Sequence, residues 1–572
     1  MTRKILEKTV HWRLFLVLAI FFVAALLIFV RLFSLQIVNY RELAAIAAKQ
    51  QGIGGALPRR GTIYFQDKDG KLQAAALNKN LYTISASLKE MEDIETASVS
   101  LAEALGVPVN EVYGRLSLGG GYRIIARKID EATAVKVRAL GIKGIGITGE
   151  SRRVYPSSSL AAHVLGFVQF DQDEETGQYG VERKYDSELS GEIGFLEGTR
   201  SSFDYLAGLG KRIVNPSADG RDVVLTVDFN IQKRVEERLT RLSAQWSAES
   251  GMITVLDPTT GRILAHAALP TFDPNSPSSV SNLKDFLNPM VEANYELGSV
   301  MKPVTMASAV NEGLIDPETH YVDTGEVRIG GYVIRNYDGK ANGRQTMTQV
   351  LEKSLNTGAV FVEQKLSHKK FAEYLGRFGF GEKTGVDLPG EVRGNISNLS
   401  AMRDIDFATA SFGQGVAVSP LQVMMAVSAI ANGGNLMKPY VVEKVVDQAG
   451  AETVGRPEVR RRVLSLETSK TLSRMLVSVT RNGFDNRAGV KGYFVAGKTG
   501  TAQIPSESGR GYSDEVIHSF VGYAPAFSPR FLIFIQLNKP RGVNFASTSL
   551  SPAFHDLAAY ILNYYSVPPD ER

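Results

Sequence analysis

The chain has 572 residues, and its 64 Lys plus Arg against 60 Asp plus Glu leave a formal net charge of +4. That small surplus, without a concentrated basic block, gives no reason to expect nucleic acid as a partner. Hydrophobic residues make up 44% and charged residues 22%, which excludes general disorder. The absence of cysteine excludes thiol nucleophiles and disulfide scaffolds, and the scattered histidines show no metal-ligand spacing.

An uncharged apolar segment lies near the N-terminus, from Leu14 to Val30. As a helix it would span roughly 26 Å, near the lower limit for a bilayer core. Basic residues outnumber acidic ones before it, which indicates a cytoplasmic N-terminus by the positive-inside rule. We predict a cytoplasmic tail over residues 1–13, a transmembrane anchor over 14–34, and an extracytoplasmic or periplasmic location for the rest. The basic residues are Arg3, Lys4, Lys8 and Arg13.

Two other interpretations of this segment are a buried core helix and a cleaved signal peptide. A core helix rarely begins a chain behind a basic tail. Ala45-Ile46-Ala47 resembles a cleavage site, but it lies about 15 residues beyond the apolar run, which itself exceeds the usual length of a signal-peptide core. The prediction is therefore an uncleaved single-pass membrane anchor.

Residues 35–221 are predicted to form a stalk and a mixed α/β region. Apolar spacing from Arg31 to Gln51 favours a helix that carries the anchor outward, until a glycine- and proline-rich stretch ends it. The predicted strands cover Leu81 to Ser85, Tyr122 to Ala126 and Ala161 to Phe170. Residues 216–220 have the composition of a linker.

Residues 222–572 are predicted to form a second unit. A strand over residues 223–227 precedes Asp228, which suits the N-cap of a helix. Two strand pairs are expected, the first over residues 252–256 and 263–267 and the second over residues 520–523 and 531–537. Helical patterns lie between them, such as Pro420 to Ala431.

The motif Ser299-Val300-Met301-Lys302 predicts a nucleophile and its base. The residues that follow favour a helix up to Gly313, with Pro303 tolerated in the first turn. Residues three apart share a helix face, so the Ser299 hydroxyl and the Lys302 amine would meet. Serine is a weak nucleophile until a base takes its proton, and lysine acts as that base only when its neutral form is accessible. On its own, the spacing is common by chance.

Two further motifs follow along the chain. Ser354-Leu355-Asn356 comes after an apolar helical pattern and says little in isolation. Lys498-Thr499-Gly500-Thr501 comes after a strand-like stretch from Tyr493 to Gly497. A lysine flanked by hydroxyls on an edge strand can bind a carboxylate, and Gly500 would let a substrate backbone approach closely. Together and in this order, the three motifs are the signature of penicillin-binding proteins and class A β-lactamases.

The chain closely resembles the class B penicillin-binding proteins, which are monofunctional peptidoglycan transpeptidases. Leu297 stands where proline is usual before the nucleophile, and we expect this departure to alter loop stiffness rather than chemistry. The stretches that carry the rest of the resemblance are Arg59 to Tyr64, Arg152 to Pro156, His163 to Gly166, Gly180 to Glu182, Ser411 to Gly415 and Ser419 to Gln422.

The resemblance implies an α/β (α+β) transpeptidase fold over residues 222–572, in which helices sandwich an antiparallel sheet. An elongated mixed α/β pedestal over residues 35–221 and a single N-terminal transmembrane helix would precede it. Ser299 would attack a D-Ala carbonyl, Lys302 would take the proton, and Ser354 would pass a proton to the leaving amine with Lys498 close by. Asn356 would hold the substrate amide. The expected carboxylate-binding residues are Lys498, Thr499 and Thr501, with Gly500 between them.

The resemblance also implies the partners: peptidoglycan stem peptides as substrates, β-lactams as covalent inhibitors, and a polytopic SEDS-type glycosyltransferase with other divisome or elongasome proteins. It implies no metal or organic cofactor. It also implies that the anchor lies in the bacterial inner (cytoplasmic) membrane. The compact length favours a division role over an elongation role. Other activities remain open, namely a D,D-carboxypeptidase or endopeptidase, a β-lactamase, a penicillin-sensing receptor and a non-catalytic scaffold.

Overall fold

The computed structural model describes residues 2–38, 58–118, 120–171, 174–192, 195–197, 213–215, 217–296, 298–483, 486–506 and 511–571. The chain forms two compact units. One comprises Met1–Arg60 with Ser190–Gly220, and the other comprises Gly61–Leu189 with Arg221–Arg572.

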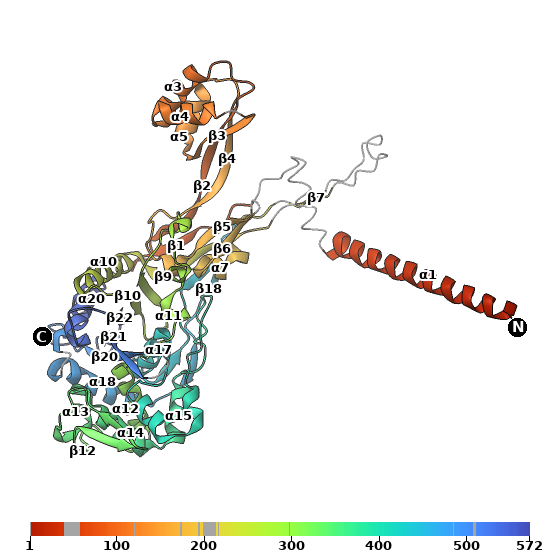
Figure 1. Ribbon diagram of the computed structural model, residues 1–572. Coiled ribbons are helices and arrows are strands. Elements are labelled where there is room, and N and C mark those ends of the chain that lie inside the picture. Colours follow the sequence, from red (N-terminus) through yellow and green to blue (C-terminus); the bar gives the residue numbers. More distant parts are fainter. Residues whose placement is uncertain are drawn as a thin grey trace. The chain divides into compact units, whose positions relative to one another are not determined.

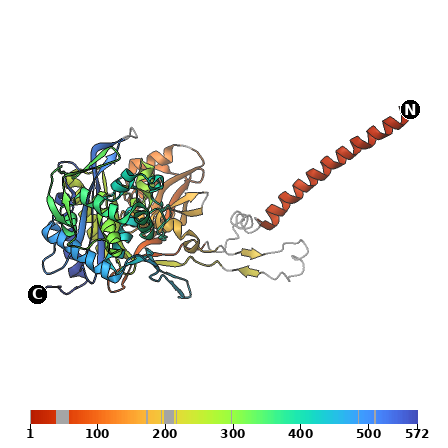
Figure 2. The ribbon, with the colours of Figure 1, turned by 90° about the horizontal axis from the view of Figure 1, so that it is seen from below.

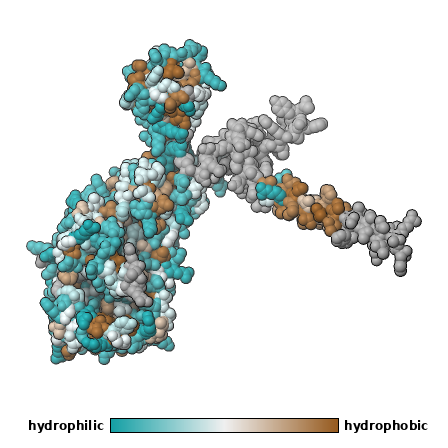
Figure 3. Space-filling view, in the orientation of Figure 1, coloured by the Kyte–Doolittle hydropathy of each residue, from teal (hydrophilic) through white to brown (hydrophobic). Residues whose placement is uncertain are grey.

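The first unit contains the N-terminal helix α1 (Thr2–Phe33), which continues as a π-helical turn over Ser34–Val38. Phe15–Ile37 is long and apolar enough to cross a membrane, and Figure 3 shows this helix mostly as hydrophobic surface, with a hydrophilic patch near one end. Strands β7 (Phe195–Glu197) and β8 (Ile213–Asn215) pair in the same unit (Figure 2). The predicted stalk beyond residue 38 and the sequence Ala45-Ile46-Ala47 lie outside the described residues.

The second unit begins with a long ladder built on β2 (Leu72–Ser87). This strand pairs with β1 (Ile63–Gln66) at its start and with β3 (Tyr122–Ile129) and β4 (Ile145–Val154) further along. Three helices pack on the part of the ladder where β2 pairs with β3 and β4 (Figure 1). The predicted strands at Leu81–Ser85 and Tyr122–Ala126 are confirmed. The helices are α3 (Ile94–Leu105), α4 (Val109–Ser117) and α5 (Glu131–Ala139).

The predicted strand over Ala161–Phe170 is only partly correct. Residues Ala162–Leu165 form the short helix α6, and the strand β5 covers Phe167–Asp171 and pairs with β6 (Glu174–Gln178). Gly166, with φ 75°, separates the two elements. A Cβ there would lie 2.2 Å from the Tyr179 carbonyl oxygen. Residues 161–167 are all buried, so hydrophobic periodicity could not distinguish helix from strand over them.

A buried ion pair joins the start of this unit to its short helix α7 (Gly180–Lys184). Nε of Arg153 donates to Oε1 of Glu182 at 2.7 Å, and the side chains are 2% and 0% exposed. The Arg153 guanidinium also donates to the Gly61 carbonyl oxygen at 2.7 Å, and the Tyr155 hydroxyl donates to Glu182 at 3.1 Å. The pair therefore connects residues from three of the stretches in which the resemblance was recognised.

Replacing Glu182 with alanine is expected to lower the free energy of unfolding by about 3–5 kcal/mol, because it leaves the Arg153 charge buried without a counter-charge. Urea unfolding of the two proteins measures the difference. The matched control is Glu92→Ala, which removes the partner of Lys143 from a pair whose side chains are 82% and 79% exposed. That change should cost less than about 1 kcal/mol. Equal losses for both variants would contradict the role given to burial.

Strand β9 (Asp222–Asp228) lies in the middle of a larger sheet, whose order is β18-β17-β9-β1-β2-β3, with β4 also paired to β2. Strand β18 covers Glu452–Val454. It pairs in parallel with β1 and antiparallel with β17 (Val442–Val446), so residues on both sides of position 221 share one sheet. Helix α10 (Phe229–Trp246) follows at once. Its predicted N-cap is confirmed, because the Asp228 carboxylate accepts from the backbone N–H groups of Asn230 and Ile231.

A five-stranded antiparallel sheet forms the centre of the remaining chain, in the order β11-β10-β22-β21-β20 (Figure 1). Alternate residues point to opposite faces. Ile533 and Ile535 of β22 belong to the core that includes α10 and α20, whereas Leu532 and Phe534 belong to the core that includes α17 and α18. Helices thus sandwich an antiparallel sheet, as predicted. The strands are β10 (Ser250–Leu256), β11 (Ile263–Leu269), β20 (Ala496–Pro505), β21 (Tyr512–Ala524) and β22 (Phe531–Asn538).

A mainly helical region occupies residues 298–482 beside this sheet. Its helices are α12 (Lys302–Asn311), α13 (Met347–Glu352), α14 (Asn356–Leu366), α15 (His368–Arg377), α16 (Asp404–Ala410), α17 (Pro420–Ala431) and α18 (Leu466–Asn482). Its two antiparallel pairs of four-residue strands are β12 (His320–Asp323) with β15 (Gly343–Thr346) and β13 (Glu326–Ile329) with β14 (Tyr332–Arg335). Helix α20 (Ser551–Tyr564) follows the sheet and packs on its other face.

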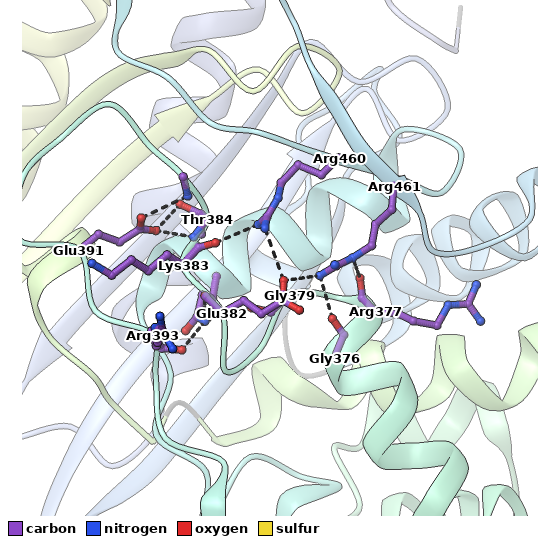
Figure 4. A network of polar contacts seen from close by, with 12 residues as sticks. Gly376, Arg377, Gly379, Glu382, Lys383, Thr384, Glu391, Arg393, Arg460 and Arg461 are labelled. Carbon is purple, nitrogen blue, oxygen red and sulfur yellow. Dashed lines mark hydrogen bonds and ion pairs between the residues drawn. The ribbon is translucent and has the colours of Figure 1, made fainter.

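A polar network holds the end of α15 against β19 (Val459–Arg462), as Figure 4 shows. The Arg461 guanidinium donates to the carbonyl oxygens of Gly376 and Arg377 at 2.8 Å each and pairs with Glu382 at 2.9 Å. Arg460 donates to the Lys383 carbonyl oxygen at 3.0 Å. A cation at a helix C-terminus satisfies carbonyl groups that have no partner within the helix. The network fixes the strand against the helix end.

Candidate active site

The predicted nucleophile lies in a tight turn. Gly298–Met301 forms one 3₁₀ turn, and α12 begins at Lys302, so Ser299 precedes the α-helix rather than lying in it. Pro303 lies in the first turn of α12, as predicted. Ser299 is half-buried, whereas Lys302 is 1% exposed. Leu297, the departure from the family pattern, lies outside the described residues.

The backbone of Gly413 packs against this turn. Its carbonyl oxygen accepts from the backbone N–H of Gly298 at 3.2 Å. Gly413 has φ 83°, and a Cβ on it would lie 2.2 Å from the Gly298 carbonyl oxygen and 2.8 Å from Cγ of Met301. Only glycine fits here, because the backbones approach too closely for a side chain. The stretch Ser411–Gly415 thereby positions Gly298, the residue before Ser299.

Replacing Gly413 with alanine is expected to slow acylation by penicillin about 100-fold, because the added methyl displaces the turn that carries Ser299. Stopped-flow acylation kinetics measure the loss. The control is Gly450→Ala, since Gly450 has nearly the same φ of 82° but nothing within 4 Å of the added Cβ. It carries the backbone strain alone and should leave the acylation rate unchanged. Similar losses in both variants would show that the contact with the turn is irrelevant.

Lys302 joins the first motif to the second. Its Nζ donates to the Ser354 carbonyl oxygen at 2.5 Å and to Oδ1 of Asn356 at 2.8 Å, and lies 3.3 Å from Oγ of Ser354. Asn356 is the first residue of α14, and Ser354 has φ 54°, which is uncommon for a residue with a side chain. This left-handed conformation turns the chain so that residues 354 and 356 both face the lysine.

The electrostatic setting of Lys302 favours the neutral amine. Burial lowers the pKa of Lys302 well below its usual value, and the positive charge of Lys498 lowers it further. The charged form loses hydration when the amine is buried, and a second cation nearby repels it. A neutral lysine at this position can accept a proton from a neighbouring hydroxyl.

The third motif lies on β20, an edge strand of the five-stranded sheet, and the side chains of Lys498 and Thr499 are buried. Nζ of Lys498 lies 3.1 Å from the Thr499 carbonyl oxygen. Thr501 is exposed, and its Oγ1 accepts from the backbone N–H of Ala546 at 3.2 Å, so its hydroxyl hydrogen can point elsewhere. The strand stretch predicted over Tyr493–Gly497 is shorter in the structure, since β20 begins at Ala496.

The turn that contains Ser299 packs directly against β20. A Cβ on Gly298 would lie 3.1 Å from Cβ of Ala502 and 3.3 Å from the Thr501 carbonyl oxygen. Ser299, Lys302 and the three residues at 499–501 therefore belong to adjoining segments. Among the described residues, no group of three or more histidine, aspartate or glutamate side chains is placed to hold a metal ion.

Two aromatic side chains that the sequence analysis did not predict as site residues also contact each other near these segments. Tyr337 follows β14, and Phe545 precedes the short helix α19 (Ala546–Ser549). Their ring centroids are 5.4 Å apart in an edge-to-face arrangement, although the side chains are 51% and 46% exposed. Each aromatic stands alone in an irregular segment, so no pattern in the sequence could have paired them.

Comparison with known proteins agrees with this geometry. Residues 251–559 match the penicillin binding protein transpeptidase domain, and residues 56–225 match the penicillin-binding protein dimerisation domain. A fold of this kind with a buried lysine beside a serine turn defines a serine acyltransferase. The chain belongs to the class B penicillin-binding proteins and is a serine D,D-transpeptidase of that family.

Several relatives cover nearly the whole chain. Stage V sporulation protein D of Bacillus subtilis is 32% identical and the match covers 99% of this chain and 88% of the relative. Peptidoglycan D,D-transpeptidase FtsI of Escherichia coli is 30% identical, with 88% and 84% covered. The crystal structure of penicillin binding protein 3 from Mycobacterium tuberculosis, complexed with aztreonam, has a TM-score of 0.69 at 27% identity and covers 90% of this chain and 97% of that one.

Proposed function

We propose that Ser299 forms the acyl-enzyme of this transpeptidase. Its Oγ attacks the carbonyl carbon of the penultimate D-Ala of a stem pentapeptide, and its proton passes to the neutral Nζ of Lys302. The bond to the terminal D-Ala then breaks, and Ser354 relays a proton to the departing amine. An amine of a neighbouring stem peptide attacks the ester and releases Ser299. The observation that carries this proposal is the convergence of three motifs on the buried Lys302 amine.

The hydrogen bonds of Lys302 support its role as the base. A neutral amine has two N–H donors and one lone pair. The Ser354 carbonyl oxygen and Oδ1 of Asn356 can only accept, and they lie nearest to Nζ, so they take the two donors. The lone pair is left for a hydroxyl. The geometry thus provides a base that is oriented before substrate arrives.

Substrate binding is assigned to β20. Lys498, Thr499 and Thr501 bind the terminal carboxylate, and Asn356 holds the substrate amide. The backbone N–H groups of Ser299 and Thr501 form the oxyanion hole, and such a donor contributes about 3–4 kcal/mol to the transition state of acyl transfer. The exposed hydroxyl of Thr501 supports this assignment, because its oxygen already accepts from Ala546 and its hydrogen can donate to a carboxylate. β-Lactams use the same groups and leave Ser299 acylated.

We further propose that the protein acts in septal wall synthesis, anchored by Phe15–Ile37 with its N-terminus in the cytoplasm. The basic residues before the apolar helix support this orientation. A polytopic SEDS-type glycosyltransferase and other divisome proteins are the proposed membrane partners. One relative carries sporulation in its name, so a sporulation role is the second candidate.

Imaging of a fluorescently tagged chain in growing cells tests the septal role. We expect bands at division sites, because the anchor holds the enzyme at a high effective concentration near its membrane partners. A version in which a cleaved export signal replaces residues 1–46 should disperse and fail to support growth, yet still react with penicillin. The tagged Ser299→Ala variant is the control and should localise normally. Lateral foci would favour elongation, and signal confined to sporulating cells would favour the second candidate.

A further inference from the structure

Helix α14, which carries Asn356, lacks a cap of its own. Its N-cap residue is Leu355, whose side chain makes no hydrogen bond to the first turn. The first N–H groups of a helix have no partner within it and need an acceptor from elsewhere. Here Oδ1 of Asn336 accepts from the backbone N–H groups of Asn356 at 3.0 Å and Thr357 at 3.3 Å. A residue 20 positions earlier therefore caps the helix that presents Asn356.

Asp323 determines which way the Asn336 amide faces. Nδ2 of Asn336 lies 2.9 Å from each oxygen of the Asp323 carboxylate. An ionised carboxylate only accepts, so the amide nitrogen must face Asp323 and the amide oxygen must face α14. The Thr357 hydroxyl donates to the same carboxylate at 2.7 Å. Both side chains are buried, with 1% of Asp323 and 3% of Asn336 exposed.

Asp323 stays ionised in this position. Burial alone would raise its pKa, but hydrogen bonds from Thr357, Asn342, Gly325 and Asn336 outweigh burial and hold the pKa below its usual value. A buried carboxylate with several donors is a strong and directional acceptor. The orientation of the Asn336 amide is therefore maintained throughout the neutral pH range.

The same arrangement orients the side chain of Asn356. Nδ2 of Asn356 donates to the Arg335 carbonyl oxygen at 2.9 Å, and Arg335 is the neighbour of Asn336. With the nitrogen held there, Oδ1 of Asn356 faces Nζ of Lys302 at 2.8 Å. If this amide turned over, its N–H₂ group would face the lysine and occupy the lone pair that the base needs. Displacement of residues 335–336 would release this constraint.

We propose that Asp323 and Asn336 are positioning residues for acylation: they hold α14 and the Asn356 amide so that the Lys302 lone pair remains directed at a hydroxyl. This inference rests on the proposed roles of Lys302 and Asn356. Neither positioning residue contacts Ser299 in the described contacts, and both act through the turn at residues 354–356. They belong to no motif in the sequence.

Exchange of the two side chains tests the proposal in the full-length protein. Asn336→Asp alone places two carboxylates face to face, and Asp323→Asn alone removes the acceptor that orients the amide. Each should lower the first-order acylation rate constant on the order of 10- to 100-fold, with little change in the dissociation constant for penicillin.

The double variant restores one amide and one carboxylate with their positions exchanged. A carboxylate at position 336 also suits a helix N-terminus. Its rate should return to within about tenfold of wild type.

Rates are expressed per active site, with the active fraction counted by the acylation burst, so a loss of folded protein does not lower them. The control is Asp130→Ala, which removes the side-chain acceptor for the backbone N–H of Thr133 at the start of α5 (2.8 Å), a helix cap that the proposal does not involve, and should keep the wild-type rate. Wild-type rates in both single variants, or a double variant slower than both singles, would overturn the positioning role. Failure of the wild type to be acylated at Ser299 would instead refute the proposed function.

Discussion

Replacement of Ser299 with alanine should abolish covalent labelling by a fluorescent penicillin, because no other hydroxyl lies in the turn between Gly298 and the buried Lys302. Labelling is measured on gels and by mass shift of the purified protein. Ser308→Ala is the matched control: Ser308 lies further along α12, is buried, and donates only to the Val304 carbonyl oxygen at 2.8 Å. That variant should label like the wild type. Labelling of Ser299→Ala at the wild-type rate would place the nucleophile elsewhere.

Replacement of Lys302 with arginine should reduce the acylation rate by about 10²- to 10⁴-fold, because arginine keeps its proton and cannot act as a base. Non-covalent binding of substrate should change less. Lys470→Arg, at an exposed position on α18, is the control and should acylate normally.

The pH dependence of acylation gives a second check on Lys302. The pKa of Lys302 is lowered in the folded protein, so its neutral amine accumulates at pH values well below the pKa of free lysine. The wild-type rate should therefore rise with pH through this depressed pKa and then level off. The arginine variant should show no such rise. A wild-type profile whose rise falls only near the pKa of free lysine would contradict a depressed pKa for Lys302.

The class of reaction could be predicted because it depends on short local patterns. The spacing of Ser299 and Lys302 already indicates that a hydroxyl and an amine lie one turn apart, and two further motifs limit the reaction to acyl transfer. Ser299 was expected in the helix, but in the structure it lies in a 3₁₀ turn before the helix. That difference arises from Gly298 and its contact with Gly413, which are separated by more than a hundred residues.

The supporting contacts could not be predicted, since they join residues far apart in the chain. Asp323, Asn336 and Asn356 each belong to a different strand end or helix start, and their hydrogen bonds exist only once β12, β14 and α14 are assembled. The strand predicted over Ala161–Phe170 was only partly correct for another reason. Residues 161–167 are all buried, so this part of the segment has no alternation of buried and exposed positions by which a helix and a strand could be told apart.

The most direct test of the catalytic assignment is to locate the penicillin adduct by fragment mass spectrometry of the acylated full-length protein. We predict one adduct, on Ser299, absent after pretreatment with a second β-lactam and absent from the Ser299→Ala protein. An adduct on Ser354, Thr501 or any other hydroxyl would contradict the assignment of Ser299 as the nucleophile and of Lys302 as its base.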